Sequence, residues 1–399
     1  MAHENQTVIK TTCPRDCYDG CGMIVTTENG QVTQVKGNPE HPTNQGKLCG
    51  KCSVAYNGVW IDEDARLLHP MRRVGKKGSG AFTPISWDEA LGEVASRLGK
   101  IVESHGASSI YHTHYTGTCS FIASDFPGRF FEHLGATEVD PDTICNKAGH
   151  VAWNYVFGDS VNGFDPRTVK NSKCILVWGA NPSASAPHVD KNWLHDNTAK
   201  VIVIDPIRHE TADRADLYLQ VRPGADAALA FAMVHVMQRD GLLDMDYIRD
   251  HVLGFDDIAS SIAECTPEWG EAQTDVPAAL IEEAARLYAI GPSLMWLGQG
   301  LQRQLGGGNI FRACAMLPAF TGNIGKPGAG AYYLNSTADI FSRGGKSPIY
   351  EADGSDDAAT VSQMDIPALL QDAETIQAYM VWNCNPDHIG LNGFQPGAG

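Results

Sequence analysis

Cysteine is concentrated near the N-terminus, where five of the eleven cysteines lie within the first 52 residues. Three residues separate Cys13 from Cys17 and Cys17 from Cys21, and Cys49 and Cys52 follow further along the chain. Thiolates are soft ligands that suit an iron–sulfur cluster or zinc. Zinc sites usually use two cysteine pairs, whereas three close ligands and one distant ligand are typical of a cluster. The spacing therefore favours a [4Fe–4S] cluster, with zinc as the alternative and the fourth ligand undecided.

Another cysteine, Cys145, stands alone in the segment DTICNKAGH, beside the start of a helical pattern. A lone cysteine is more often a core residue than a ligand or a nucleophile. Lys147 and His150 lie close enough in sequence to activate the thiol, although placement on a helix surface explains them equally well. These residues by themselves leave the role of Cys145 open.

The elements that would position such residues can be read from the hydrophobic pattern. Short apolar runs bounded by turn residues are typical of buried parallel strands, and runs with helical periodicity alternate with them. The predicted strands are residues 174–178, 201–205, 293–297 and 379–382. The predicted helices cover residues 226–239 and 277–289, and a further helix begins at the capping box Ser86–Glu89. This alternation predicts a doubly wound α/β layer, which binds its ligand at the carboxyl ends of the strands.

The loops at those strand ends carry the residue types that such a ligand would need. Gly179 lets the backbone approach a ligand, and Asn181 could cap a helix or bind a sugar or phosphate. Asp205 follows its strand directly, as a ribose-binding acid would. Each loop taken singly is explained as well by an ordinary tight turn. No G-x-G-x-x-G motif follows a strand and no Walker A motif occurs, so NAD and ATP are not favoured.

Length and charge limit the class of protein. The 399 residues suggest two or three domains, and the first 60 contain too few apolar residues to fold readily without a metal. A net charge of −17 argues against a nucleic-acid partner. No apolar run reaches the roughly 18 residues of a membrane span, so we expect no direct membrane insertion. The N-terminal segment has no export signal pattern, which predicts a cytoplasmic location.

Taken together, these segments resemble the molybdopterin oxidoreductases of the dimethyl sulfoxide reductase superfamily. The resemblance covers essentially the whole chain and rests on the segments CPRDCYDGCGM, LCGKC, LLHPMRRVGKKGSGAFTPISWDEAL, VWGANPSASAP, VIDPIRHETADRADLYLQVRPGADAAL and FTGNIGKPGAG, in that order. It implies an α/β fold in which a small N-terminal [4Fe–4S] module precedes doubly wound α/β domains of the bis-pterin molybdoenzyme type. Four segments are implied. They are the cluster module at 1–65, the first part of an α/β domain at 66–140, a Rossmann-like molybdopterin-dinucleotide-binding domain at 141–330, and a return to the α/β domain at 331–399, cut short.

The resemblance also implies roles for individual residues. Cys13, Cys17, Cys21 and Cys49 match the cluster ligands, which selects iron–sulfur over zinc and Cys49 over Cys52. Lys51 matches a basic residue between cluster and pterin that relays electrons, and Cys145 matches the ligand of molybdenum or tungsten. The residues that match loops binding molybdopterin guanine dinucleotide, two copies of which are expected in the full protein, are Gly179, Asn181, Asp205, Gly224, Asp226, Gly298 and Gly300.

The implied function is that of a catalytic subunit. A molybdenum or tungsten centre held by two molybdopterin guanine dinucleotides would oxidise or reduce a small-molecule substrate, and the [4Fe–4S] cluster would exchange electrons with a partner protein. Formate is disfavoured because Asn146 follows Cys145 where formate dehydrogenases have histidine. His112, His114 and Tyr115, within residues 111–130, are candidates for a substrate funnel, with plain exposed loop residues as the alternative.

Three other functions remain compatible with the sequence. The first is an iron–sulfur electron-transfer subunit that has the same fold but no catalytic metal, against which Cys145 and the pterin-loop residues argue. The second is a hydratase with the same cofactor. The third is an inactive fragment, because the chain ends where members of the family continue for several hundred residues.

Overall fold

The computed structural model describes residues 6–115, 117–118, 123, 126–160, 163–334, 359–372 and 374–385. The chain divides into two compact units. One unit contains Met1–Ile144 together with Gly344–Gly399, and the other contains Cys145–Arg343. The four-segment division expected from the sequence stays a prediction. Among the described residues, no helix combines the length and the apolar character that crossing a membrane requires.

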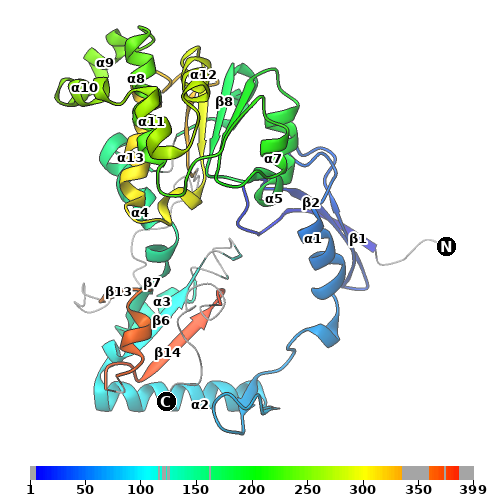
Figure 1. Cartoon of the computed structure of the whole chain (residues 1–399). Helices are drawn as coiled ribbons and strands as arrows, with labels where there is room; N and C mark the ends of the chain where they lie inside the picture. Colours follow the sequence, from blue (N-terminus) through cyan, green and yellow to red (C-terminus); the bar gives the residue numbers. More distant parts are fainter. Residues whose placement is uncertain are drawn as a thin grey trace. The chain divides into compact units, whose positions relative to one another are not determined.

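The N-terminal module of the first unit is a small antiparallel sheet followed by a helical segment (Figure 1). Its strands pair in the order β1 (Gln6–Thr12), β2 (Gly22–Glu28) and β3 (Gln31–Gly37). A short helix α1 (Gly50–Val54) continues directly into the π-helical turn η1 (Ala55–Val59). The buried core of this module is small and consists of Met23, Val35, Cys52, Ala55 and Tyr56.

The remainder of the first unit contains a hairpin, a long helix and a parallel sheet. The hairpin pairs β4 (Met71–Arg73) with β5 (Phe82–Pro84). Helix α2 (Trp87–His105) begins at the predicted capping box, in which Ser86 and Glu89 bond reciprocally. The sheet has the strand order β13 (Thr360–Ser362), β7 (Thr137–Asp140), β6 (Ile110–His114) and β14 (Ala378–Trp382), so the predicted strand at 379–382 is confirmed. Helices α3 (Gly128–Leu134) and α14 (Ile366–Leu369) complete the described part.

The second unit is built on a five-stranded parallel sheet. Its spatial order is β10 (Leu217–Leu219), β9 (Lys200–Ile204), β8 (Cys174–Trp178), β11 (Ser293–Leu297) and β12 (Gly330–Tyr332). The chain runs outward from β8 through β9 to β10 and then returns to place β11 on the other side of β8. This reversal is the topological switch point where doubly wound folds bind ligands. The three strands predicted for this region are confirmed, with β9 beginning one residue early.

Helices connect and cover these strands. In Figure 1, α12 and α7 lie on opposite sides of the sheet, as expected for right-handed crossovers. The predicted helices 226–239 and 277–289 correspond to α8 and α12. The helices of this unit are α4 (Lys147–Phe157), α5 (Pro182–Ser185), α6 (Pro187–Val189), α7 (Glu210–Asp213), α8 (Asp226–Arg239), α9 (Met245–His251), α10 (Phe255–Glu264), α11 (Pro267–Thr274), α12 (Ala278–Ala289) and α13 (Gly307–Phe320).

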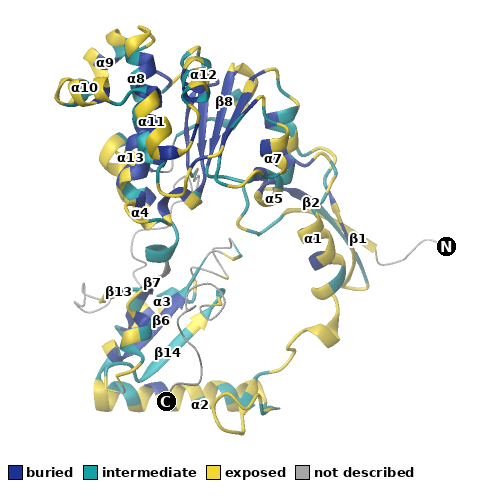
Figure 2. Ribbon diagram, viewed as in Figure 1, coloured by how far each residue is buried: buried dark blue, intermediate teal, exposed yellow. Residues whose placement is uncertain are grey.

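Burial explains why the central strands are apolar throughout. Every residue of β8 and of β11 is buried, and Figure 2 shows these strands as the darkest part of the unit. A parallel strand covered by helices on both faces has no solvent-facing side, so the alternation of a half-exposed strand is absent. Helices α8 and α13 contribute buried residues to the same core cluster. The sheet is therefore a rigid support for the loops at its carboxyl edge.

Candidate cluster and cofactor sites

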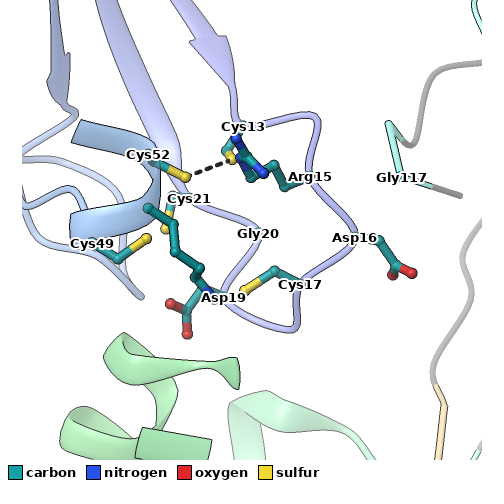
Figure 3. Close-up of a pocket in the computed structure, with 11 residues that line it drawn as sticks. Cys13, Arg15, Asp16, Cys17, Asp19, Gly20, Cys21, Cys49, Cys52 and Gly117 are labelled. Carbon is teal, nitrogen blue, oxygen red and sulfur yellow. Dashed lines mark hydrogen bonds between the residues drawn. The ribbon is translucent and has the colours of Figure 1, made fainter. Parts of the chain in front are cut away.

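Five thiols line one cavity of about 260 Å³ in the N-terminal module. They belong to Cys13, Cys17, Cys21, Cys49 and Cys52, and Figure 3 shows their sulfur atoms gathered around the opening between α1 and the loop that follows β1. The structure thus brings together all four predicted cluster ligands and also the alternative fourth ligand. Lys51 lines the same cavity.

Two backbone features bring these cysteines together. The backbone N–H of Cys13 donates to the carbonyl oxygen of Cys21 at 2.8 Å, which closes the loop that carries the first three thiols. Gly37 ends strand β3, and a Cβ atom there would lie 2.4 Å from the carbonyl oxygen of Lys47. Only glycine allows that approach, which places the segment before Cys49 against the sheet. Cys49 then caps helix α1.

The donor set fits a metal centre that binds thiolates. Burial raises the pKa of Cys17 to about 11, with Lys51 acting in the opposite direction, and burial also raises the pKa of Cys21. Burial likewise raises the pKa of Cys52 to about 12. Sulfurs in such surroundings carry negative charge only when a cation balances it. A positively charged iron centre would supply that balance for the thiolates of its four predicted ligands.

Cys13 has two further partners that come from the helical segment. Its Sγ atom lies 3.6 Å from the Sγ atom of Cys52 and 3.0 Å from the hydroxyl oxygen of Tyr56. Both partners belong to the buried core of the module. Tyr56 was not among the predicted site residues. The signal was its position four residues after Cys52, because residues one turn apart on a helix share a face.

The second site lies in the other unit, around Cys145. Cys145 precedes helix α4, and its Sγ atom lies 3.5 Å from Oε1 of Gln299 and 3.6 Å from Nη2 of Arg303. Nη2 of Arg303 also donates to Oε1 of Gln299 at 3.2 Å. Gln299 begins the 3₁₀ turn η8 (Gln299–Gln302), which directly follows strand β11. The cysteine therefore lies at the carboxyl end of β11, where a doubly wound sheet binds its ligand.

A second set of hydrogen bonds holds α4 in this position. Oε1 of Gln302 accepts from the backbone N–H of Gly149 at 2.6 Å, and its Nε2 donates to the Tyr333 hydroxyl at 2.7 Å. Tyr333 follows strand β12. The glutamine thus ties the helix after Cys145 to the ends of two strands.

Three predicted glycines meet at the switch point between β8 and β11. Gly179 has a positive φ of 62°, and a Cβ atom on Gly298 would lie 1.8 Å from the Gly179 carbonyl oxygen. A Cβ atom on Gly300 would lie 3.3 Å from the same oxygen. The two strand ends therefore touch backbone to backbone, which a side chain at either position would prevent. The result is a close backbone contact between the two strand ends, at the edge where the ligand of such a fold binds.

The predicted polar residues lie in the loops around this surface. Oδ1 of Asn181 accepts from the hydroxyl of Ser183 at 2.6 Å. Oδ1 of Asp205 accepts from the backbone N–H of Ile207 at 2.8 Å, and Nε2 of His209 lies 3.7 Å from its Oδ2. Burial raises the pKa of the Asp205 carboxyl, while that hydrogen bond and His209 oppose the effect. A hydroxyl or amino donor from a bound nucleotide would stabilise the charged carboxylate further.

Asp226 is more deeply placed than the sequence suggested. It begins helix α8, is only 2% exposed, and accepts from Nε1 of Trp178 at 2.8 Å. Nε2 of Gln304 donates to its other oxygen at 3.5 Å. Burial raises the pKa of this carboxyl. Gly224 lies in the loop before α8, and a Cβ atom added to it would lie 3.6 Å from Oε1 of Gln304. A contact between Asp226 and a nucleotide stays a prediction.

Comparison with known proteins gives matches for the parts of the chain that contain the two sites. Residues 66–389 match the molybdopterin oxidoreductase family, and residues 6–59 match the molybdopterin oxidoreductase Fe4S4 domain. The chain belongs to the molybdopterin oxidoreductase family. Its relatives include formate dehydrogenases and dimethyl sulfoxide reductases, so the predicted superfamily is confirmed. The two matches coincide with the thiol-lined module and with the parts of the chain that contain both parallel sheets.

Individual relatives of this molybdopterin oxidoreductase are named for different functions. The probable oxidoreductase YyaE of Bacillus subtilis is 36% identical over 331 residues, which are 82% of this chain and 48% of that protein. Formate dehydrogenase H of Escherichia coli is 31% identical, over 81% of this chain and 46% of that protein. The solved structure of acetylene hydratase from Pelobacter acetylenicus superposes with a TM-score of 0.66 at 26% identity, covering 80% of this chain and 44% of that one. The chain thus spans about half the length of these relatives, and the predicted fold class is confirmed.

The candidate funnel residues of this molybdopterin oxidoreductase were expected in a loop, but the structure places His112 and His114 in strand β6. His112 lies within strand β6, is 4% exposed, and stacks on Phe131 with ring centroids 4.5 Å apart. Burial lowers the pKa of His112 to about 4. It is therefore a neutral core residue at physiological pH. His114 ends the strand and stacks on Trp382 at 4.7 Å. Residues 116, 119–122 and 124–125 of the expected funnel lie outside the described residues.

Proposed function

We propose that the chain provides the cluster module and much of the cofactor-binding region of a catalytic subunit. The subunit would be an oxidoreductase that depends on molybdenum or tungsten bound to two molybdopterin guanine dinucleotides. One observation carries the proposal: the Cys145 thiol is held at the switch point of a parallel sheet, beside strand ends that glycines bring into backbone contact. A metal ligand and a dinucleotide surface belong together in this family. An electron-transfer subunit without a catalytic metal would not need that arrangement.

Each predicted residue then has a defined task. Cys145 would ligate the metal, and Gly179, Gly298 and Gly300 would let a dinucleotide approach the backbone. Asp205 would accept hydrogen bonds from ribose or guanine donors, since an ionised carboxylate is an acceptor only. When bound, the metal–pterin group would supply the two-electron chemistry, and the protein would supply placement and tuning of potential.

The N-terminal module would handle electrons. Cys13, Cys17, Cys21 and Cys49 would hold the [4Fe–4S] cluster, and Lys51 would add a positive charge beside it. Cys52 would remain a thiol in the core of the module. We further propose that the cluster exchanges electrons with a partner protein. Several relatives are named as subunits or chains, including the F420-dependent formate dehydrogenase subunit alpha of Methanocaldococcus jannaschii, which is 31% identical.

The substrate is proposed only as a small molecule. The names of the relatives refer to formate, dimethyl sulfoxide and acetylene, so the family does not select one substrate. The residue after Cys145 is Asn146, and this continues to disfavour formate. Nε2 of Gln302 and the Tyr333 hydroxyl are polar groups in the neighbourhood of this residue.

Metal analysis of the anaerobically purified protein tests the proposal. We expect about four iron atoms and about one molybdenum or tungsten atom per chain, as one cubane cluster and one metal centre require. Iron without molybdenum or tungsten would favour the electron-transfer subunit instead. Zinc without iron would contradict both functions.

A further inference from the structure

Cys13, one of the four predicted cluster ligands, contacts two side chains that are not part of the family's ligand pattern. The Tyr56 hydroxyl oxygen lies 3.0 Å from the Cys13 Sγ atom, and the Cys52 Sγ atom lies 3.6 Å from it. Figure 3 marks the second contact with a dashed line. Both partners are about 4% exposed, so water competes little for these contacts.

The direction of the two hydrogen bonds follows from the chemistry of a ligated sulfur. A free Cys13 thiol could donate or accept in either contact. Once its sulfur binds iron it is a thiolate without hydrogen and can only accept. The phenol of Tyr56 and the thiol of Cys52 both keep their hydrogens near neutral pH in their ordinary state. In the cluster-bound protein, Tyr56 and Cys52 must therefore be the donors.

Other contacts hold Tyr56 in place. The side chain of Asn57 accepts from the backbone N–H of Val35 at 2.7 Å and donates to the Val35 carbonyl at 2.9 Å. These two bonds fasten the η1 turn to strand β3. The Tyr56 ring also meets the Trp60 ring edge to face, with centroids 4.8 Å apart. The hydroxyl is thus directed at the sulfur by fixed neighbours and needs no rearrangement when the cluster changes its charge.

We propose that Tyr56 and Cys52 are positioning residues that raise the reduction potential of the cluster by donating hydrogen bonds to the Cys13 sulfur. The inference rests on the proposed function, because it requires a cluster with Cys13 as a ligand. Reduction adds one electron to the cluster, and no bond forms or breaks. The added negative charge spreads onto the ligating sulfurs, so donors to a sulfur stabilise the reduced state more than the oxidised state.

Tyr56→Phe and Cys52→Ala test the proposal in the anaerobically purified full chain. Both variants should retain four irons per chain but have a more negative midpoint potential, read from the reduced-cluster EPR signal during titration with dithionite. Only the part of the hydrogen-bond free energy that differs between the two oxidation states shifts the potential. Loss of a bond that contributes about 1 kcal/mol should therefore weaken reduction by at most about fivefold, or about 40 mV at 59 mV per decade. The readout does not depend on turnover.

Two further variants separate hydrogen bonding from packing. Cys52→Ser keeps a donor at the same place, so its potential should lie closer to that of the wild type than the potential of Cys52→Ala. Tyr288→Phe removes a hydroxyl from a fully buried tyrosine in α12 of the other unit and should leave the potential unchanged.

The outcomes distinguish the inference from the function on which it rests. Absence of any iron in the wild type would overturn the proposed function. A four-iron cluster whose potential is the same in Tyr56→Phe and in the wild type would overturn the inference alone. Loss of the cluster in Cys52→Ala, with retention in a Cys49→Ala variant, would make Cys52 a ligand and would also overturn it.

Discussion

At the scale of single residues, Cys145 shows how neighbours give a side chain its chemistry. Its thiol meets Gln299 and Arg303, which are 154 and 158 positions away in the sequence. An exposed guanidinium group so close to the sulfur places a positive charge where the metal is proposed to bind. The lone cysteine of the sequence thereby becomes part of a polar cluster, which a residue that only fills the core would not need.

Cys145→Ser should abolish turnover while leaving the cluster intact. Serine supplies a harder oxygen ligand in place of a soft thiolate, so the metal should be lost or bound differently. The visible absorption of the cluster should be unchanged, because its proposed ligands are Cys13, Cys17, Cys21 and Cys49. Metal content, absorption and turnover with an artificial electron donor or acceptor are the measurements.

Cys265→Ser provides a matched control for that variant. Cys265 lies at the end of α10, and its Sγ donates to the Ser261 carbonyl at 3.3 Å, a bond that serine can replace. This control should keep full metal content and activity. Unchanged turnover in Cys145→Ser would show that Cys145 is not the metal ligand.

At the scale of elements, glycines are what allow the close contact between the ends of β8 and β11. Gly179 and Gly298 touch there, and each belongs to a loop that directly follows its strand. The strands themselves could be predicted from their apolar runs, since full burial on both faces leaves no other composition. The sequence also placed glycines after them. That the two loops touch depends on β11 pairing with β8, which only the strand order decides.

Gly298→Ala should therefore loosen this part of the sheet. The new Cβ would lie 1.8 Å from the Gly179 carbonyl oxygen, and backbone atoms cannot rotate away as a flexible side chain would. Forced overpacking of this kind typically costs about 1–3 kcal/mol. Hydrogen exchange measured by mass spectrometry should show faster exchange in peptides containing β8 and β11.

A glycine-to-alanine substitution in helix α2 should have the opposite effect on hydrogen exchange. Gly99 lies within helix α2, where an added Cβ meets nothing within 4 Å. Gly99→Ala should slow exchange in α2, since alanine is favoured over glycine in a helix by about 0.5–1 kcal/mol. Equal exchange of β8 in Gly298→Ala and the wild type would disprove the close contact described here.

At the scale of the whole molecule, the two candidate sites are supported by cores of very different size. The cluster module has a small buried core that includes Cys52 itself, whereas the parallel sheet of the second unit is buried between helices. A module with so little apolar burial depends on its metal for stability. The second unit does not, because its strands and helices exclude water without a bound group.

Removing iron should expose this difference. After anaerobic treatment with an iron chelator, peptides from β1–β3 and α1 should exchange hydrogen much faster than before. Peptides from β8–β11 should keep their protection, because their stability comes from apolar burial. Hydrogen exchange on the same sample measures both regions. An equal loss of protection in both units, or no change in either, would contradict this account.

Local patterns in the sequence were enough to predict the parallel strands, the capped helix α2 and the soft-ligand character of the N-terminal cysteines, because periodicity, capping and ligand chemistry act over a few residues. They also pointed to the loops after the strands. Only the tertiary structure decided which distant residues meet: Tyr56 at Cys13, Arg303 at Cys145, and Trp178 at Asp226. Those contacts depend on strand order and on helix docking. Both are set by packing across the whole unit, so no local sequence pattern of fixed spacing predicts them.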